Sequence, residues 1–205
     1  MNYDTLARSI PWVFHRTFRR ELATRMDRRA AGAAMRRAGV LYREMLRRSP
    51  SIGRKNELRI YVLTAAYAAA VYKACGLSAE ETGAVFSSAM ERAAAWRLYM
   101  RRTGKKVFTE KWQARRDRVM TETRKREYPA NFVAEFIYGD TLNSYRVNYL
   151  ECGICKLYAR ENCLELAPYM CRFDYVMARY MGCTLERTRT IAGGDGLCDF
   201  HFTKA

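Results

Sequence analysis

The sequence predicts an α+β protein: an N-terminal helical region followed by a four-stranded antiparallel sheet with packed helices (β-β-α-α-β-β). Up to residue 130, apolar residues recur with helical spacing; beyond it, short alternating runs rich in β-formers are separated by glycine turns. The net charge of +16 divides at the same place, because residues 1–130 hold 29 of the 37 Lys and Arg and 12 of the 21 Asp and Glu. We therefore expect a basic helical region at 1–130 and a Cys-rich α+β region at 131–205, together forming one compact domain.

The first helices are expected to be basic and amphipathic. Apolar residues at every fourth position from Phe14 to Met26 lie among arginines, and Pro11 stands near the start of this helix. A narrower apolar stripe continues to Met45. The proline and glycine after it, in 49–53, are helix breakers.

Three further helices are predicted before residue 130. Gly76 suits the position after a helix end, Ser78 to Glu81 has the form of a capping box, and Gly104 and Pro129 are expected to end the later helices. The first of the three is the most apolar stretch, but alanine and tyrosine dominate it, so we expect a buried helix and no membrane span. The expected ranges are 57–75, 78–103 and 109–127.

The last 75 residues alternate between strand and helix signals. Two antiparallel strands are followed by a short helix, a longer helix with Pro168 at its start, and two more strands. The Gly193–Gly196 run lies between strands without a following helix, which favours a turn over a phosphate-binding loop. The expected strands are 132–138, 144–151, 184–192 and 197–202, and the longer helix is 168–181.

Cysteine is concentrated in this second region, which contains six of the seven cysteines. The number is odd and no secretory signal is visible, so we expect a cytoplasmic protein whose thiols are free, metal-bound or reactive. Any single cysteine is most simply a packing residue. An alternative is a four-thiolate zinc site formed by Cys152, Cys155, Cys163 and Cys171. Because the second CxxC pair of such a site is missing, we expect no structural zinc. The cofactor is left unidentified.

Two placements indicate reactive groups. Cys171 is predicted to lie in a first helical turn, where the helix dipole favours a thiolate, and Asp174 shares its helical face. A nearby carboxylate opposes the thiolate, so these two effects conflict. In strand 197–202, Cys198 is expected on one face, and Asp199 with the lone His201 on the other.

Four blocks of the C-terminal region occur in a characteristic order: Tyr149–Cys155, Glu165–Tyr175, Arg187–Gly193 and Cys198–Phe202. Together they resemble the L-2-amino-thiazoline-4-carboxylic acid hydrolase family. The resemblance covers roughly residues 130–205, and the helical front is similar only in general character.

This resemblance implies a hydrolase that opens a cyclic isothiourea bearing a carboxylate and yields an N-carbamoyl cysteine. Such a site needs a nucleophile or activated water, an acid for the departing sulfur and a cation for the carboxylate. By resemblance, Cys171, Asp174, Cys198 and Asp199 are the candidate catalytic residues, with Cys171 the best nucleophile candidate. Glu151, Cys152 and Cys155 are the candidate substrate-binding residues.

The expected partner is a small anionic cyclic substrate. The basic helices carry no recognisable nucleic-acid motif, so we expect their charge to be mainly solvated surface and no specific nucleic-acid binding. The oligomeric state is left open. The alternative is a non-catalytic ligand- or metal-sensing module whose basic surface binds nucleic acid, membrane or a protein partner.

Overall fold

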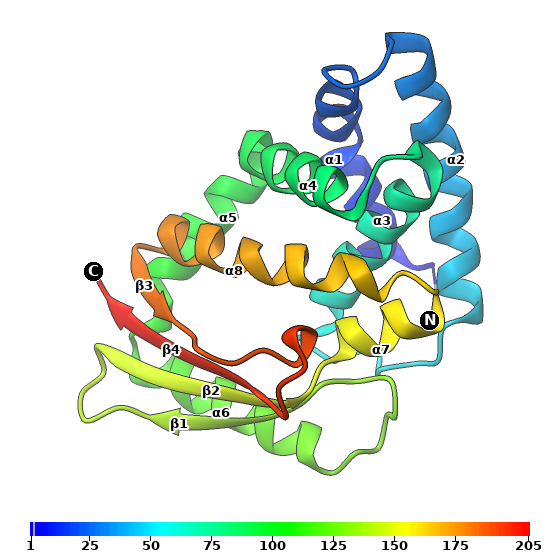
Figure 1. Cartoon of the computed structure of the whole chain (residues 1–205). Coiled ribbons are helices and arrows are strands. Elements are labelled where there is room, and N and C mark those ends of the chain that lie inside the picture. The colour runs from blue at the N-terminus through cyan, green and yellow to red at the C-terminus, as the bar shows by residue number, and fades with distance from the viewer. Residues whose placement is uncertain (2) are drawn as a thin grey trace.

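The computed structural model describes residue 1 and residues 3–205, and it has the predicted α+β architecture (Figure 1). Six helices precede the first strand, and two more lie between the second and third strands. The helices are α1 (Thr5–Leu22), α2 (Arg28–Arg48), α3 (Arg59–Cys75), α4 (Ala79–Arg92), α5 (Ala94–Val107), α6 (Glu110–Arg124), α7 (Gly153–Arg160) and α8 (Ala167–Met181). The strands are β1 (Val133–Tyr138), β2 (Ser144–Glu151), β3 (Cys183–Glu186) and β4 (Cys198–Lys204).

The four strands form one antiparallel sheet in the order β1-β2-β4-β3. Phe136 pairs with Val147, and Val147 pairs with Phe200, so the three side chains lie on one face across three strands. This face is covered by helices, whereas Arg146 and Leu150 on the opposite face are exposed. The two predicted hairpins therefore belong to the same sheet.

The core joins the helical region to the sheet region. One cluster of buried hydrophobic residues takes in members of α1 to α8 and of the sheet. Tyr158 on α7 is fully buried and donates a hydrogen bond to the carbonyl oxygen of Ala65 on α3, at 3.1 Å. Figure 1 shows α8 between the sheet and the α1–α4 helices, so this helix contributes to the packing on both sides.

The helix predicted for 78–103 is wrong in two details. It is two helices, α4 and α5, which meet at the extended residue Ala93. Gly104 does not end a helix, because α5 continues through it to Val107. This glycine instead allows the end of α8 to approach α5 closely: a Cβ at residue 104 would lie 1.9 Å from the carbonyl oxygen of Met181. A glycine required for close packing and one that ends a helix look the same in the sequence.

The strand predicted for 184–192 is also too long, because β3 ends at Glu186. The backbone N–H groups of Thr188 and Arg189 donate to the carboxylate of Asp199, at 3.0 and 2.6 Å, instead of pairing with a strand. A short 3₁₀ turn at Ile191–Gly193 follows. The Gly193–Gly196 run is therefore part of a longer connection and not a tight hairpin turn.

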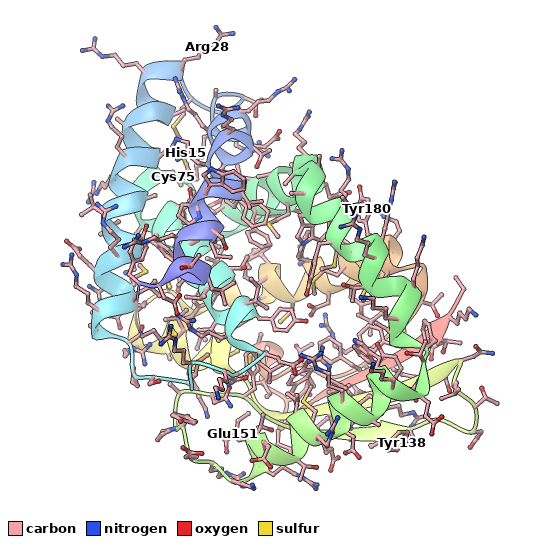
Figure 2. The ribbon with its side chains drawn as sticks, turned by 180° about the vertical axis from the view of Figure 1, so that it is seen from behind. His15, Arg28, Cys75, Tyr138, Glu151 and Tyr180 are labelled. Atoms are coloured by element: carbon pink, nitrogen blue, oxygen red, sulfur yellow. The ribbon has the colours of Figure 1, made fainter. Side chains whose placement is uncertain are left out.

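Arginines cover the outside of the first two helices. Figure 2 shows nitrogen-tipped side chains projecting outward along α2, with Arg28 at the end of the molecule farthest from the sheet. Asp27 caps α2 by accepting hydrogen bonds from the N–H groups of Arg29 and Ala30, at 2.8 and 3.0 Å. Within residues 1 and 3–205, no helix combines the length and the apolarity that a bilayer crossing requires.

Replacing two helical glycines tests the close contact between α5 and α8. We expect Gly104→Ala to lower the free energy of unfolding by about 1–3 kcal/mol, because the new methyl group meets the backbone of Met181. In the control Gly39→Ala on α2, the methyl meets only the Arg43 guanidinium at 3.9 Å, so a gain of about 0.5–1 kcal/mol is expected. Urea unfolding measures both; equal effects of the two substitutions would contradict the assigned contact.

Candidate active site

A cavity of about 390 Å³ lies between the covered face of the sheet and helices α5, α6 and α8. Aromatic and aliphatic side chains of β2 and β4 line its sheet side, and polar groups enter from α6, α7, α8 and β4. Five of the seven predicted site residues line this cavity: Cys152, Cys155, Cys171, Asp174 and Cys198.

Cys152 is the last residue before α7 and lies at the cap position of that helix. Its sulfur accepts a hydrogen bond from the backbone N–H of Cys155, at 3.5 Å. The hydrogen bond from the Cys155 thiol, with those from the backbone N–H groups of Cys155 and Ile154, lowers the pKa of Cys152. The pKa of Cys155 is raised in turn, because that thiol keeps its proton as the donor. Cys152 is therefore the cysteine in the cavity that forms a thiolate most readily.

Cys171 has a different environment from the one expected. It is the fifth residue of α8, beyond the first turn in which the N–H groups are unpaired. Burial and the neighbouring Asp174 raise the pKa of the Cys171 thiol to about 12. Of the two opposing effects expected on Cys171, the one that disfavours the thiolate is larger, so the thiol stays neutral.

Asp174 reaches the cavity from α8 and is held from behind by Arg187. The Arg187 Nη1 lies 2.6 Å from the Asp174 Oδ2, and its Nη2 donates to the carbonyl oxygen of Cys171 at 3.0 Å. The guanidinium also lies over the ring of Phe200. Burial raises the pKa of Asp174 to about 6, although the Arg187 cation acts in the opposite direction. A carboxyl group with this pKa can both accept and return a proton near neutral pH.

The two predicted residues on β4 lie on opposite faces, as the alternation indicated. Cys198 is buried in the cavity wall, where its sulfur accepts a hydrogen bond from the N–H of Ile191 at 3.2 Å and burial raises its pKa to about 11. Asp199 does not line the cavity. Burial opposes its ionisation, but hydrogen bonds from the Thr188 hydroxyl and from the backbone lower its pKa to about 2. Asp199 therefore holds the β3–β4 connection in place.

Glu151 also lies outside the cavity, at the end of β2. Its carboxylate is paired with Arg126, at 2.9 Å, and with Lys156. Figure 2 shows Glu151 and Tyr138 at opposite ends of the sheet region.

Cys163, the fourth cysteine of the zinc alternative, is fully buried and does not line the cavity. In the described part of the chain, no group of three or more His, Cys, Asp or Glu residues is arranged to hold a metal ion.

Sequence reasoning missed Arg116, which lines the cavity from α6. Its guanidinium lies 4.9 Å from the ring centroid of Trp112, one helical turn away. Among residues 1 and 3–205 it forms no ion pair with a carboxylate, unlike its neighbour Arg115, which pairs with Glu57 at 2.8 Å. A sequence feature could have identified Arg116: it is spaced four residues from both Trp112 and Met120, on the single apolar face of a very polar helix.

No curated protein and no solved structure matches the chain. The family model described as L-2-amino-thiazoline-4-carboxylic acid hydrolase matches residues 53–202, which extends the resemblance of the four C-terminal blocks to α3–α6. Helices α1 and α2 precede the matched stretch. Because the match covers most of the sequence, including every element that lines the cavity, the chain belongs to the L-2-amino-thiazoline-4-carboxylic acid hydrolase family.

Proposed function

We propose that this protein hydrolyses a cyclic C–N/C–S compound of the 2-amino-thiazoline-4-carboxylate type, with the reaction taking place in the cavity between α8 and the sheet. The observation that carries the proposal is the presence of two groups in one cavity: Cys152, with a lowered pKa, and Asp174, with a pKa of about 6. A nucleophile and a proton carrier are the minimum that ring opening requires.

Cys152 is the proposed nucleophile. Its sulfur adds to the ring carbon between nitrogen and sulfur while Asp174 accepts the thiol proton, directly or through one water. The bond from this carbon to the ring sulfur then breaks, and the departing sulfur takes the proton from Asp174. An isothiourea attached to Cys152 remains. The hydrogen bonds at the start of α7, which stabilise the thiolate, favour both its attack and its later departure.

Water completes the reaction at the same carbon. Asp174 accepts a proton from the attacking water and returns a proton to the sulfur of Cys152 as it leaves. The product carries a carbamoyl group, and one water is consumed in all. Cys171 and Cys198, with pKa values of about 12 and 11, are neutral thiols in the cavity wall and are proposed to contact the substrate.

Arg116 is the proposed partner of the substrate carboxylate. It faces the cavity without a carboxylate partner in the described residues, and Tyr61 and Tyr149 line the same space. An arginine can bind a carboxylate through two hydrogen bonds, and its stacking on Trp112 fixes the plane of the guanidinium. This would orient the ring with respect to Cys152.

The nucleophile is tested by Cys152→Ser. We expect turnover of 2-amino-thiazoline-4-carboxylate to fall by at least about 10³-fold, because a serine hydroxyl is not ionised at neutral pH. Cys75→Ser is the matched control, since Cys75 lies on α3 outside the cavity. Mass spectrometry of the wild-type enzyme during turnover is expected to detect the adduct on Cys152; normal turnover by the serine variant would exclude this role.

The proton carrier is tested by the pH dependence of kcat/KM. Asp174 must be ionised to act as base, so the rate is expected to rise with pH through about 6. Arg187→Gln removes a cation that favours the carboxylate, which raises the pKa of Asp174 further, so the rising limb is expected to move to higher pH. Arg189→Gln, which removes an exposed charge paired with Asp199, is expected to leave the limb in place. A limb that moves equally in both variants would refute the assignment.

The carboxylate partner is tested by Arg116→Met. Loss of a charge-assisted contact made in both ground and transition states is expected to raise KM by about 10- to 100-fold with kcat little changed. Arg118→Met on the exposed side of α6 is the control. A large loss of kcat at unchanged KM would show instead that Arg116 acts in the chemical step.

A further inference from the structure

A second cavity, of about 240 Å³, adjoins the first on the side away from the sheet. It lies among α1, α3, α4, α5 and α8, and its walls are largely apolar, with Val13, Ile60, Met90, Trp96 and Phe173 among them. The residues that line both cavities are Tyr61, Tyr99, Met100, Ile154, Met170, Asp174 and Met177. The two spaces therefore meet at Asp174, the proposed proton carrier.

The chemistry of the walls changes from one cavity to the other. The first contains Arg116, four cysteine thiols and Asp174, whereas the only ionisable side chains lining the second, among the described residues, are Asp174, Tyr61 and Tyr99 at the junction. An amphipathic ligand matches this arrangement, with its polar end in the first cavity and its apolar end in the second. Methionines at the junction can adapt to chains of different shape.

The volumes also exceed the needs of the family's named substrate. That compound has about nine non-hydrogen atoms, and a site of about 390 Å³ is already in the range that accepts larger ligands. At about 30 Å³ per heavy atom, the space that a water molecule occupies in the liquid, the second cavity of about 240 Å³ holds roughly eight carbon atoms. Part of its wall comes from α1, which precedes the stretch matching the family.

We infer that the second cavity binds an apolar group of about eight carbon atoms carried by the ligand whose polar end occupies the first cavity. This deepens the proposed function, on which it rests: the substrate class becomes thiazolines that bear a hydrophobic substituent. The unsubstituted ring would then use only part of the available binding surface.

The experiment compares 2-(alkylamino)-thiazoline-4-carboxylates with methyl to octyl chains. Dissociation constants from calorimetry are expected to fall by about fourfold per added methylene until the second cavity is filled, as burial of apolar surface predicts. Val13→Phe and, independently, Ile60→Phe place a ring in the second cavity alone and are expected to abolish this dependence while the methyl compound binds as before. Val40→Phe, at an exposed position of α2, is the matched control, and its dissociation constants are expected to depend on chain length as those of the wild type do.

Octan-1-ol, which carries no thiazoline ring, separates failure of this inference from failure of the proposed function. It is expected to raise the unfolding temperature of the wild type and of Val40→Phe, but not of Val13→Phe or Ile60→Phe. If the unsubstituted ring is turned over but the dissociation constants of the alkyl compounds do not depend on chain length, the inference is overturned and the proposed function stands. Octanol binding that Val13→Phe and Ile60→Phe abolish, without binding or turnover of any thiazoline, would overturn the proposed function and retain the apolar site.

Discussion

The ion pair between Arg187 and Asp174 is the contact on which the site depends most. Arg187 follows β3, and its guanidinium holds both the carboxylate of Asp174 and the carbonyl oxygen of Cys171, so it ties α8 to the sheet. Its side chain is only 5% exposed. Removing Arg187 would leave the Asp174 carboxylate without its cation and the carbonyl oxygen of Cys171 without this donor. The position of α8, and with it the roof of the cavity, therefore rests on this pair.

The same pair sets the charge at the centre of the molecule. Asp174 is the residue where the polar and the apolar cavities meet, and without a cation beside it burial would keep it protonated over a wider pH range. With Arg187 in place, the carboxyl group has a pKa of about 6 and changes its charge near neutral pH. One contact thus positions the helix and sets the charge of the proposed proton carrier.

Four cysteines in one cavity differ in acidity because the groups around each sulfur differ. Cys152 precedes a helix and receives hydrogen bonds from the Cys155 thiol and from backbone N–H groups, whereas Cys171 is buried within a helix and beside a carboxylate. Cys198 receives one backbone hydrogen bond, which does not offset its burial. The arginines show a similar division: those on α1 and α2 are exposed to solvent, whereas Arg116 on α6 lies against an aromatic ring and lines the cavity. Composition reports how many such residues there are, but only their surroundings decide which are reactive.

The sequence by itself determined the fold class, the sheet and five of the residues that line the cavity. Local signals were sufficient for these: alternation in 144–151, a capping box at Ser78, and the facing of Cys198 and Asp199 to opposite sides of β4. The convergence of Cys171, Asp174 and Cys198 followed from packing α8 on the sheet, which the sequence also indicated.

Tertiary structure alone decided the rest, because it depends on contacts between residues far apart in the chain. Gly104 reads as a helix terminator until the backbone of Met181 is seen to lie against it. The hydrogen bonds of Asp199 to Thr188 and Arg189, and its place outside the cavity, depend on how the β3–β4 connection folds back onto β4. The pKa of Cys171 could not be settled from its position near a helix start, since burial and Asp174 outweigh the helix dipole there. A sequence states which groups are present, whereas solvation and neighbouring charge, which decide their chemistry, exist only once the chain has folded.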